Sequence, residues 1–494
     1  MLRRIGLAIA LLLLVPSLTA AKTLYVTPAG DDHLSGNESE PLLTLQRAAD
    51  LVQPGDTVFV RAGTYAPFTV RAIGTADAPI RFVADAGTQV NATGEAVDAM
   101  TLDGAAWIEL EGFGATSSGG AGLRLRNCSA VTIRRNQFVD NQLWGLIADH
   151  CDELLVVDNQ IRNSARTHGL YLANSGDRCI VRNNVVAGNA SAGIAIGGDN
   201  KSEQDGIITG TLVEDNILMS NGVDRSASIV LDGAVATVLR NNVIAKGGGA
   251  GVTLQHKYGG AASIGTLLEH NTIVMALNTS VAIELRDAAV DTTLRNNILV
   301  AGIWPIGART ADDLVPEAKG TLAVSLDSLA GLQSDHNVVT PRFFIGDDAT
   351  PLTLQQWQQR TKQDVHSVNP LIYRLFRDAP NDNFALVDGS AAVDRGADGK
   401  GLGRDVAGHS RPVGLRVDIG AYEYCTPQTC HDVERAPDPP RTGPVAVVKA
   451  GPPVVMVPRG CCGGGGPETV VGPGALVLLG WPRRRRKATR WRPR

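Results

Sequence analysis

Short runs of alternating apolar and polar residues recur through the middle of the chain at a nearly constant interval. Four of these runs begin with a glycine, at Gly122, Gly145, Gly169 and Gly193, so that their starts are 23, 24 and 24 residues apart. Later runs, two of them after longer gaps, lie at 228–231, 251–254 and 282–285. A fixed period of this size predicts structural repeats that stack on one another.

A second series of positions, between these runs, places an asparagine before an aliphatic or aromatic residue. Its members are Asn136, Asn159, Asn183, Asn216, Asn241, Asn271, Asn296 and Asn337. Each repeat has two or three short alternating runs and no helical pattern, which predicts one turn of a strand solenoid. Stacked turns place equivalent residues about 4.8 Å apart, so inward aliphatics form core columns and asparagines form a hydrogen-bonded ladder. The repeats therefore predict an all-β parallel β-helix. The alternative is a leucine-rich repeat, but the helical segment that such a repeat requires is absent from this sequence.

Residues before and after the repeats resemble the ends of bacterial right-handed parallel β-helix proteins of the pectate-lyase-like superfamily, which includes polysaccharide lyase family nine. The first segment has Gly30-Asp-Asp, a Pro-Leu-Leu-Thr-Leu run from Pro41, and Pro-Gly-Asp-Thr-Val from Pro54. The last has Ser-Asp-His-Asn from Ser334 and Asp-Ile-Gly-Ala-Tyr-Glu from Asp418. The resemblance covers about 22–424. It implies a right-handed β-helix whose open end is covered by a short N-terminal helix.

This capping helix is expected to turn one apolar face, made by Leu45, Ala48, Ala49 and Val52, towards the solenoid. The resemblance and the composition together give the expected organisation of the chain. The expected parts are a signal peptide (1–21), the cap and first coils (22–90), the β-helix repeats (91–345), the closing coils (346–424), a Pro-rich linker (425–460) and a sorting or anchor tail (461–494).

The two ends of the chain indicate export. Arg3 and Arg4 precede an apolar run that is too short for a membrane span and is followed by small residues, as in a secretory signal. Cys461, Cys462 and the basic run at 483–487 resemble the C-terminal sorting tails of Gram-negative bacteria, which predicts membrane attachment through the tail. A low-complexity tail is the alternative. The expected location is extracellular, on the cell surface or in the periplasm.

Charge and cysteine content refine this expectation. Without Arg3, Arg4 and the eight basic residues of 483–494, 36 Lys and Arg face 50 Asp and Glu, a net charge of −14. Such a body repels nucleic acid, so no nucleic-acid partner is expected. Cys128 and Cys151 each follow a repeat glycine by six residues. They should stack, which favours a disulfide over two buried thiols, and Cys425 and Cys430 are expected to close a small loop.

In the lyases of this superfamily, the substrate lies along one face of the β-helix. Breaking a uronate glycoside by β-elimination requires a cation on the sugar carboxylate, a base for the neighbouring proton and a donor for the leaving oxygen. Calcium held by aspartates commonly supplies the first. The coil expected to hold it reads Asn-Gln-Leu-Trp-Gly at 141–145, without an acidic ligand. No metal ligand is therefore assigned, and the dependence on calcium is left open.

Polar residues gather at one expected edge, just after the repeat strands. His256 or Lys257 is the candidate base, and Tyr171 or His168 is the candidate proton donor. Asp149, Asp199 and Asp232 are the candidates for substrate binding. The other interpretation is that these are solvated turn residues of an ordinary solenoid. The expected function is a monomeric surface or envelope protein whose partner is a polysaccharide or glycan surface. Its reaction, if any, is that of a polysaccharide lyase or epimerase, then a glycoside hydrolase; a non-catalytic structural, adhesive or binding protein is the alternative.

Overall fold

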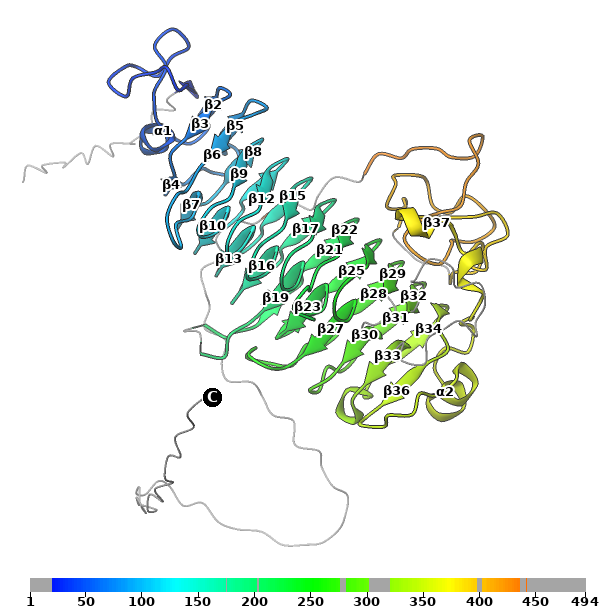
Figure 1. Ribbon diagram of the computed structural model, residues 1–494. Helices are drawn as coiled ribbons and strands as arrows, with labels where there is room; N and C mark the ends of the chain where they lie inside the picture. The colour runs from blue at the N-terminus through cyan, green and yellow to red at the C-terminus, as the bar shows by residue number, and fades with distance from the viewer. Residues whose placement is uncertain are drawn as a thin grey trace, which may run out of the picture. The chain divides into compact units, whose positions relative to one another are not determined.

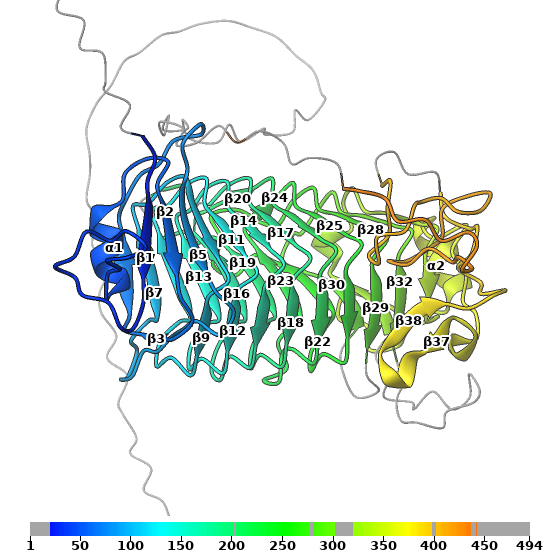
Figure 2. The same ribbon diagram turned by 90° about the horizontal axis from the view of Figure 1, so that it is seen from above.

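The computed structural model describes residues 20–435 and 441, except 175, 202–203, 276–280, 302–319 and 398–401. Three long parallel sheets form the walls of a solenoid, and each coil contributes one strand to each sheet. Figures 1 and 2 show the coils stacked one on the next. The predicted fold class, an all-β right-handed parallel β-helix, is confirmed.

Sheet 1 consists of β1 (Thr23–Val26), β2 (Thr57–Val60), β5 (Ile80–Ala84), β8 (Ile108–Glu111), β11 (Thr132–Arg134), β14 (Leu155–Val157), β17 (Ile180–Arg182), β21 (Leu212–Glu214), β25 (Val238–Arg240), β28 (Leu267–Glu269), β31 (Thr293–Arg295) and β34 (Gln333–Asp335). Sheet 2 consists of β4 (Phe68–Val70), β7 (Met100–Asp103), β10 (Leu123–Arg126), β13 (Leu146–Asp149), β16 (Leu170–Ala173), β19 (Ile194–Gly197), β23 (Ile229–Asp232), β27 (Val252–Gln255), β30 (Val281–Leu285), β33 (Gly320–Val324) and β36 (Phe343–Ile345). Sheet 3 consists of β3 (Thr64–Tyr65), β6 (Gln89–Val90), β9 (Gly114–Thr116), β12 (Gln137–Val139), β15 (Gln160–Arg162), β18 (Val185–Ala187), β22 (Ile217–Met219), β26 (Val243–Ala245), β29 (Thr272–Met275), β32 (Ile298–Ala301) and β35 (Val338–Val339).

The repeat runs form sheet 2, and their register follows the sequence repeat. Leu146, Leu170, Ile194, Ile229 and Val252 pair with one another in successive strands and are fully buried. Because side chains alternate between the two faces of a strand, these residues form one inward column of the core. The next residue in each strand points outward, so the same register aligns the surface positions.

The asparagine ladder runs along the corner between sheets 1 and 3. Its members are Asn136, Asn159, Asn184, Asn216, Asn242, Asn271, Asn297 and Asn337. Where two asparagines are adjacent, the second takes the ladder position, which corrects the predicted positions Asn183, Asn241 and Asn296. The first adopts a left-handed conformation, with φ of 51°, 52° and 55° in these three residues. Asparagine tolerates this conformation better than most residues.

Both ends of the solenoid are covered. Helix α1 (Leu45–Leu51) packs Leu45, Ala48 and Ala49 against the first coils, which confirms the predicted capping helix. Helix α2 (Leu354–Thr361) stacks the buried Trp357 on Phe343, with ring centroids 4.9 Å apart. The remaining elements are the parallel pair β20 (Ile208–Thr209) and β24 (Ala234–Val235), the antiparallel pair β37 (Phe376–Asp378) and β38 (Asn383–Leu386), and short 3-10 turns at Leu326–Ser328, Ile372–Arg374 and Ala379–Asn381.

The cysteines behave differently in the two parts of the fold. Cys425 and Cys430 form the predicted disulfide. Cys128 and Cys151 stack as expected but are free buried thiols, so the predicted disulfide between them is absent from the structure. In-register stacking directs both side chains the same way, and the sulfur of Cys151 instead accepts the backbone N–H of Cys128 at 3.3 Å.

The membrane-related predictions fall mainly outside the described residues. Positions 1–19 of the predicted signal peptide, most of the linker and the whole tail with Cys461 and Cys462 lie there. No helix in the part of the chain that the structure describes is long and apolar enough to span a bilayer.

Candidate functional site

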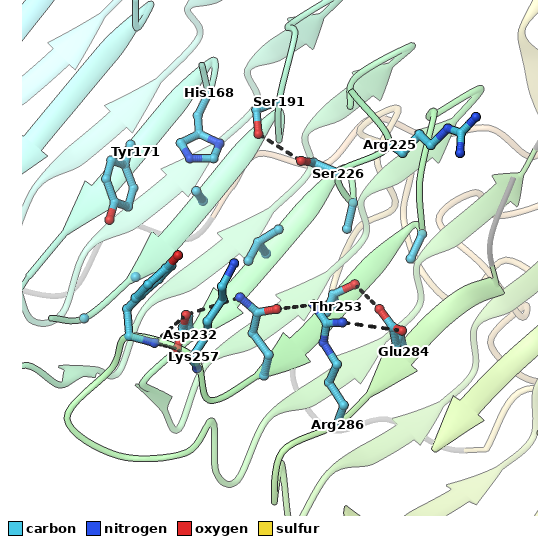
Figure 3. Close-up of a pocket in the computed structure, with 18 residues that line it drawn as sticks. His168, Tyr171, Ser191, Arg225, Ser226, Asp232, Thr253, Lys257, Glu284 and Arg286 are labelled. Carbon is cyan, nitrogen blue, oxygen red and sulfur yellow. Dashed lines mark hydrogen bonds and ion pairs between the residues drawn. The ribbon is translucent and has the colours of Figure 1, made fainter. Parts of the chain in front are cut away.

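A groove of about 540 Å³ lies on the outward face of sheet 2, over strands β16 to β30 (Figure 3). It exists because outward side chains become small across two coils. The outward column reads Tyr171, Ala195, Val230, Thr253 and Glu284 from β16 to β30. Ala195 and Val230 are the small residues of this column. Since coils are spaced about 4.8 Å apart, these two residues open a trough about 10 Å wide between polar walls.

Tyr171 and His168 form one wall of the groove, with their ring centroids 5.2 Å apart. A Cβ on Gly197 would lie 3.2 Å from the Tyr171 hydroxyl, so this glycine leaves room for the phenol. Burial raises the pKa of Tyr171 to about 12, and the neighbouring carboxylate charges, chiefly that of Asp232, add to the effect. The phenol therefore keeps its proton at neutral pH and can donate a hydrogen bond.

His168 also has a structural contact. Its Nδ1 accepts the backbone N–H of Ala192 at 3.2 Å. Burial lowers the pKa of His168 and so favours the neutral ring that this hydrogen bond requires. This hydrogen bond therefore holds the His168 ring against the next coil.

Asp232 holds the loop that follows β27. Its buried carboxylate accepts the backbone N–H groups of Lys257 at 2.8 Å, Tyr258 at 3.1 Å and Gly259 at 3.1 Å, and the side-chain amide of Gln255 at 3.2 Å. An ionised carboxylate with several such donors is strongly tied. The geometry accordingly makes Asp232 a positioning residue for the loop that carries Lys257.

Lys257 is the cation that this loop presents to the groove. Its ammonium lies 4.9 Å from the centre of the Tyr258 ring, and Tyr258 is 59% exposed. In Figure 3 the Lys257 side chain extends from the loop towards the wall formed by His168 and Tyr171. The Lys257 amine and the Tyr258 ring thus border the same groove.

Charged side chains from the following coils complete the lining. Glu284 accepts a hydrogen bond from Thr253 at 3.1 Å and lies 3.9 Å from the Arg286 guanidinium, which also donates to Gln255. Arg225 also lines the groove, but its side chain is exposed and extends away from the other labelled residues (Figure 3). The lining therefore combines the cationic side chains of Arg225, Lys257 and Arg286 with the carboxylates of Asp232 and Glu284, so a ligand there meets charges of both signs.

The structure brings together four of the predicted site residues: His168, Tyr171, Asp232 and Lys257 line the groove. Asp149 and Asp199 line an adjoining depression of about 300 Å³, which shares Tyr171 and Tyr258 with the groove.

The remaining predicted residue, His256, does not line the groove. Its Nε2 contacts the Gly259 carbonyl oxygen at 3.1 Å. Sequence reasoning missed Arg225, Tyr258, Glu284 and Arg286. The repeat register offered a signal for Glu284, which follows Thr253 in the outward column.

Two groups of three residues in the described part of the chain bring metal-ligating atoms close together. One is Asp335 with His336 and His366, and the other is His409 with the disulfide-bonded Cys425 and Cys430. Neither group lines the groove.

Comparison with known proteins supports the architecture. A family model described as "Periplasmic copper-binding protein (NosD)" matches residues 53–216, and the "Right handed beta helix region" model matches residues 144–311. The pectate lyase PEL9 of Emericella nidulans is 36% identical over 93 residues, which are 18% of this chain and 22% of that protein. The solved structure of pectate lyase Pel9A matches with a TM-score of 0.54 at 14% identity, covering 82% of this chain and 97% of that one.

These matches place the chain in the class of right-handed parallel β-helix proteins with a pectate-lyase-like fold. The curated relative is matched over less than a quarter of its length, and the likeness to the solved lyase concerns the fold.

Proposed function

We propose that the protein binds an acidic polysaccharide in the groove and acts on a uronate residue as a lyase or epimerase. The observation that carries this proposal is the joint presence of Lys257, Tyr171 and Arg286 around a floor of small side chains. Ligand grooves of this kind combine an open floor with a few convergent polar groups. The pectate lyase relatives agree with this substrate class.

The residues supply each part that abstraction of a sugar proton requires. Arg286 or Arg225 would pair with the uronate carboxylate and make the neighbouring carbon-bound proton more acidic. The Lys257 amine, in its neutral form, would take that proton. In elimination, the electron pair would form a carbon–carbon double bond while the glycosidic carbon–oxygen bond breaks, and Tyr171 would protonate the leaving oxygen. In epimerisation, the glycosidic bond would stay intact and Tyr171 would instead reprotonate the carbanion from the face opposite Lys257.

A non-catalytic role in carbohydrate binding is the second candidate. Asp232 binds the backbone of the loop after β27, and His256 contacts the Gly259 carbonyl of the same loop, as structural residues do. The match to a periplasmic protein family and the Cys425–Cys430 disulfide support an exported location for either role. Attachment through the tail remains a separate proposal, based on its sequence.

The test is to incubate the purified protein with pectic, alginate and neutral polysaccharides, with and without calcium. Ultraviolet absorbance reports unsaturated ends, NMR reports epimerised sugars, and affinity electrophoresis reports binding. Lys257→Ala removes the proposed base. Lys362→Ala is the matched control, because Lys362 is exposed at the end of α2, where its ammonium contacts the Gln359 carbonyl.

Product from an acidic polymer that is lost in Lys257→Ala and kept in Lys362→Ala would support catalysis in the groove. Binding without product, weakened by Arg286→Ala, would favour the non-catalytic role. If the protein neither bound nor converted any polymer of the panel, while circular dichroism showed it to be folded, both proposals would be contradicted.

A further inference from the structure

A cluster of two imidazoles and one carboxylate lies at the C-terminal end of the solenoid, apart from the residues that line the groove. Asp335 ends strand β34, His336 follows it, and His366 belongs to the segment after α2. The two imidazole rings stack with centroids 4.8 Å apart. The three ligand atoms, one from each residue, all lie within 4.8 Å of one another.

The backbone orients the carboxylate of Asp335 towards the two rings. Its Oδ1 accepts the backbone N–H of His336 at 2.9 Å and that of His366 at 2.7 Å. Its Oδ2 faces the imidazoles, 2.7 Å from Nδ1 of His366 and 3.5 Å from Nδ1 of His336. One oxygen thus fixes the group while the other is directed between two nitrogen donors, an arrangement typical of ligands held in place by a second set of contacts.

The segment that carries His366 is itself fixed to the last coil. Val368 pairs with Val338 of β35, and the Val339 N–H donates to the Val368 carbonyl at 2.9 Å. Asp364 accepts hydrogen bonds from Trp357 Nε1 at 2.9 Å and Ser367 Oγ at 2.6 Å. The three candidate ligands therefore stand on ordered backbone, while the His366 side chain is 64% exposed and open to ions from solvent.

The spacing suits a transition metal. Bonds of about 2.1 Å from zinc to nitrogen or oxygen put neighbouring ligand atoms about 3.0 to 3.4 Å apart. The two observed Oδ2–Nδ1 distances, 2.7 and 3.5 Å, bracket that range, so small side-chain rotations would suffice. Imidazole with carboxylate suits zinc-like ions, whereas calcium prefers an all-oxygen set of six or more ligands.

We propose that Asp335, His336 and His366 bind one divalent transition-metal ion of the zinc type, with water completing the coordination. The ion would link the closing segment to the last full coil of the solenoid. This site is independent of the proposed carbohydrate function, since none of its residues lines the groove.

The test uses the untagged, non-reduced protein after treatment with EDTA, titrated with Zn²⁺ and separately with Ca²⁺ by calorimetry. His336→Ala, His366→Ala and Asp335→Asn each remove one ligand; the last keeps the side-chain shape and an oxygen for the backbone donors. Each should weaken Zn²⁺ binding about tenfold or more, since even outer partners of metal ligands change affinity 10- to 100-fold. His33→Ala is the control, because His33 also contacts an aspartate, Asp31, at 2.8 Å, without a second imidazole.

The expected result is one saturable Zn²⁺ site per chain, no comparable Ca²⁺ binding, and a Zn²⁺-dependent rise in melting temperature that the three ligand variants lose. Absence of saturable Zn²⁺ binding in the native protein would overturn the proposal. Unchanged binding in all three ligand variants would also overturn it, because the ion would then be bound elsewhere. Asp335→Asn keeps the test decisive if a histidine variant fails to fold.

Discussion

The asparagine ladder and the groove are two rows of polar residues built on the same coils, yet their surroundings are opposite. In the ladder, the buried Asn216 accepts two hydrogen bonds from Asn184, and the two hydrogens of its amide nitrogen are shared among acceptors on Val181, Glu214 and Asn242. In the groove, Lys257 and Tyr171 border open space above small side chains. The same repeat thus uses polar atoms in one corner for architecture and presents them on another face to a ligand.

Polar residues of a solenoid thus fall into two kinds, those that bond only within the fold and those that can bond a ligand. A buried amide with all its partners in adjacent coils is needed by the fold itself. A polar group that borders a groove can still form hydrogen bonds to a ligand. Asp232 is intermediate between the two cases, because it lines the groove but its carboxylate accepts hydrogen bonds from the backbone of the loop after β27.

The largest effect is expected from the removal of a ladder residue. Asn216→Ala should lower the free energy of unfolding by about 3 kcal/mol or more, because it leaves several buried donors and acceptors without partners. Urea unfolding followed by circular dichroism measures this. Asn381→Ala, at an exposed asparagine whose amide contacts Asp378 at 2.8 Å, is the control and should cost less than about 1 kcal/mol. Equal losses in the two variants would show that the ladder has no special structural role.

The second prediction concerns the intermediate case. Asp232→Ala should free the loop at 256–259 and raise the rate of tryptic cleavage after Lys257 more than tenfold, because cleavage requires local opening of the backbone. Mass spectrometry of limited digests maps the cut. Asp287→Ala, at an exposed aspartate that pairs with Arg286 at 3.8 Å, should leave the rate nearly unchanged. A digestion rate in Asp232→Ala equal to that of the native protein would refute the positioning role.

The third prediction narrows the groove without removing a polar group. Gly197→Ala places a methyl group against the Tyr171 hydroxyl and should weaken polysaccharide binding, or slow turnover, about tenfold, which corresponds to about 1.4 kcal/mol. Gly403→Ala is the control, since a Cβ there meets nothing within 4 Å. If both variants bound alike, the space beside Tyr171 would have no part in recognition.

The sequence predicted the architecture better than the groove, for a physical reason. Repeat spacing and inward aliphatics determine register, so they predicted the solenoid and the corner row of asparagines, while the apolar face at 45–52 and the family resemblance predicted the capping helix. The ladder was misplaced by one residue at Asn183, Asn241 and Asn296, because adjacent asparagines have the same spacing and only the backbone conformation distinguishes them.

The groove depends on loops that break the period. Arg225 belongs to such a loop and has no counterpart in the repeat, so no spacing rule indicated it. Tyr171 and Lys257 were found because they lie on or directly after repeat strands. The bonds that Asp232 makes to its loop required coordinates, since a sequence does not reveal the direction of a backbone N–H.

The smallest expected effect is a pH dependence at His168, where the groove and the fold meet. Its pKa is lowered by burial, so the folded protein holds the neutral ring while the unfolded chain takes up a proton near pH 6.5. The stability that His168 contributes is therefore present above that pH and is lost as the pH falls towards the lowered pKa.

His168→Asn offers its amide oxygen where Nδ1 accepts the Ala192 N–H. It should keep most of the stability at pH 7.5 and show a shallower loss between pH 6.5 and 5, by less than about 1 kcal/mol. Urea midpoints measured at several pH values provide the check, with the exposed His33→Asn as control. A slope identical to that of the native protein would mean that His168 is protonated in the folded state, and that its hydrogen bond to the next coil does not hold the ring neutral.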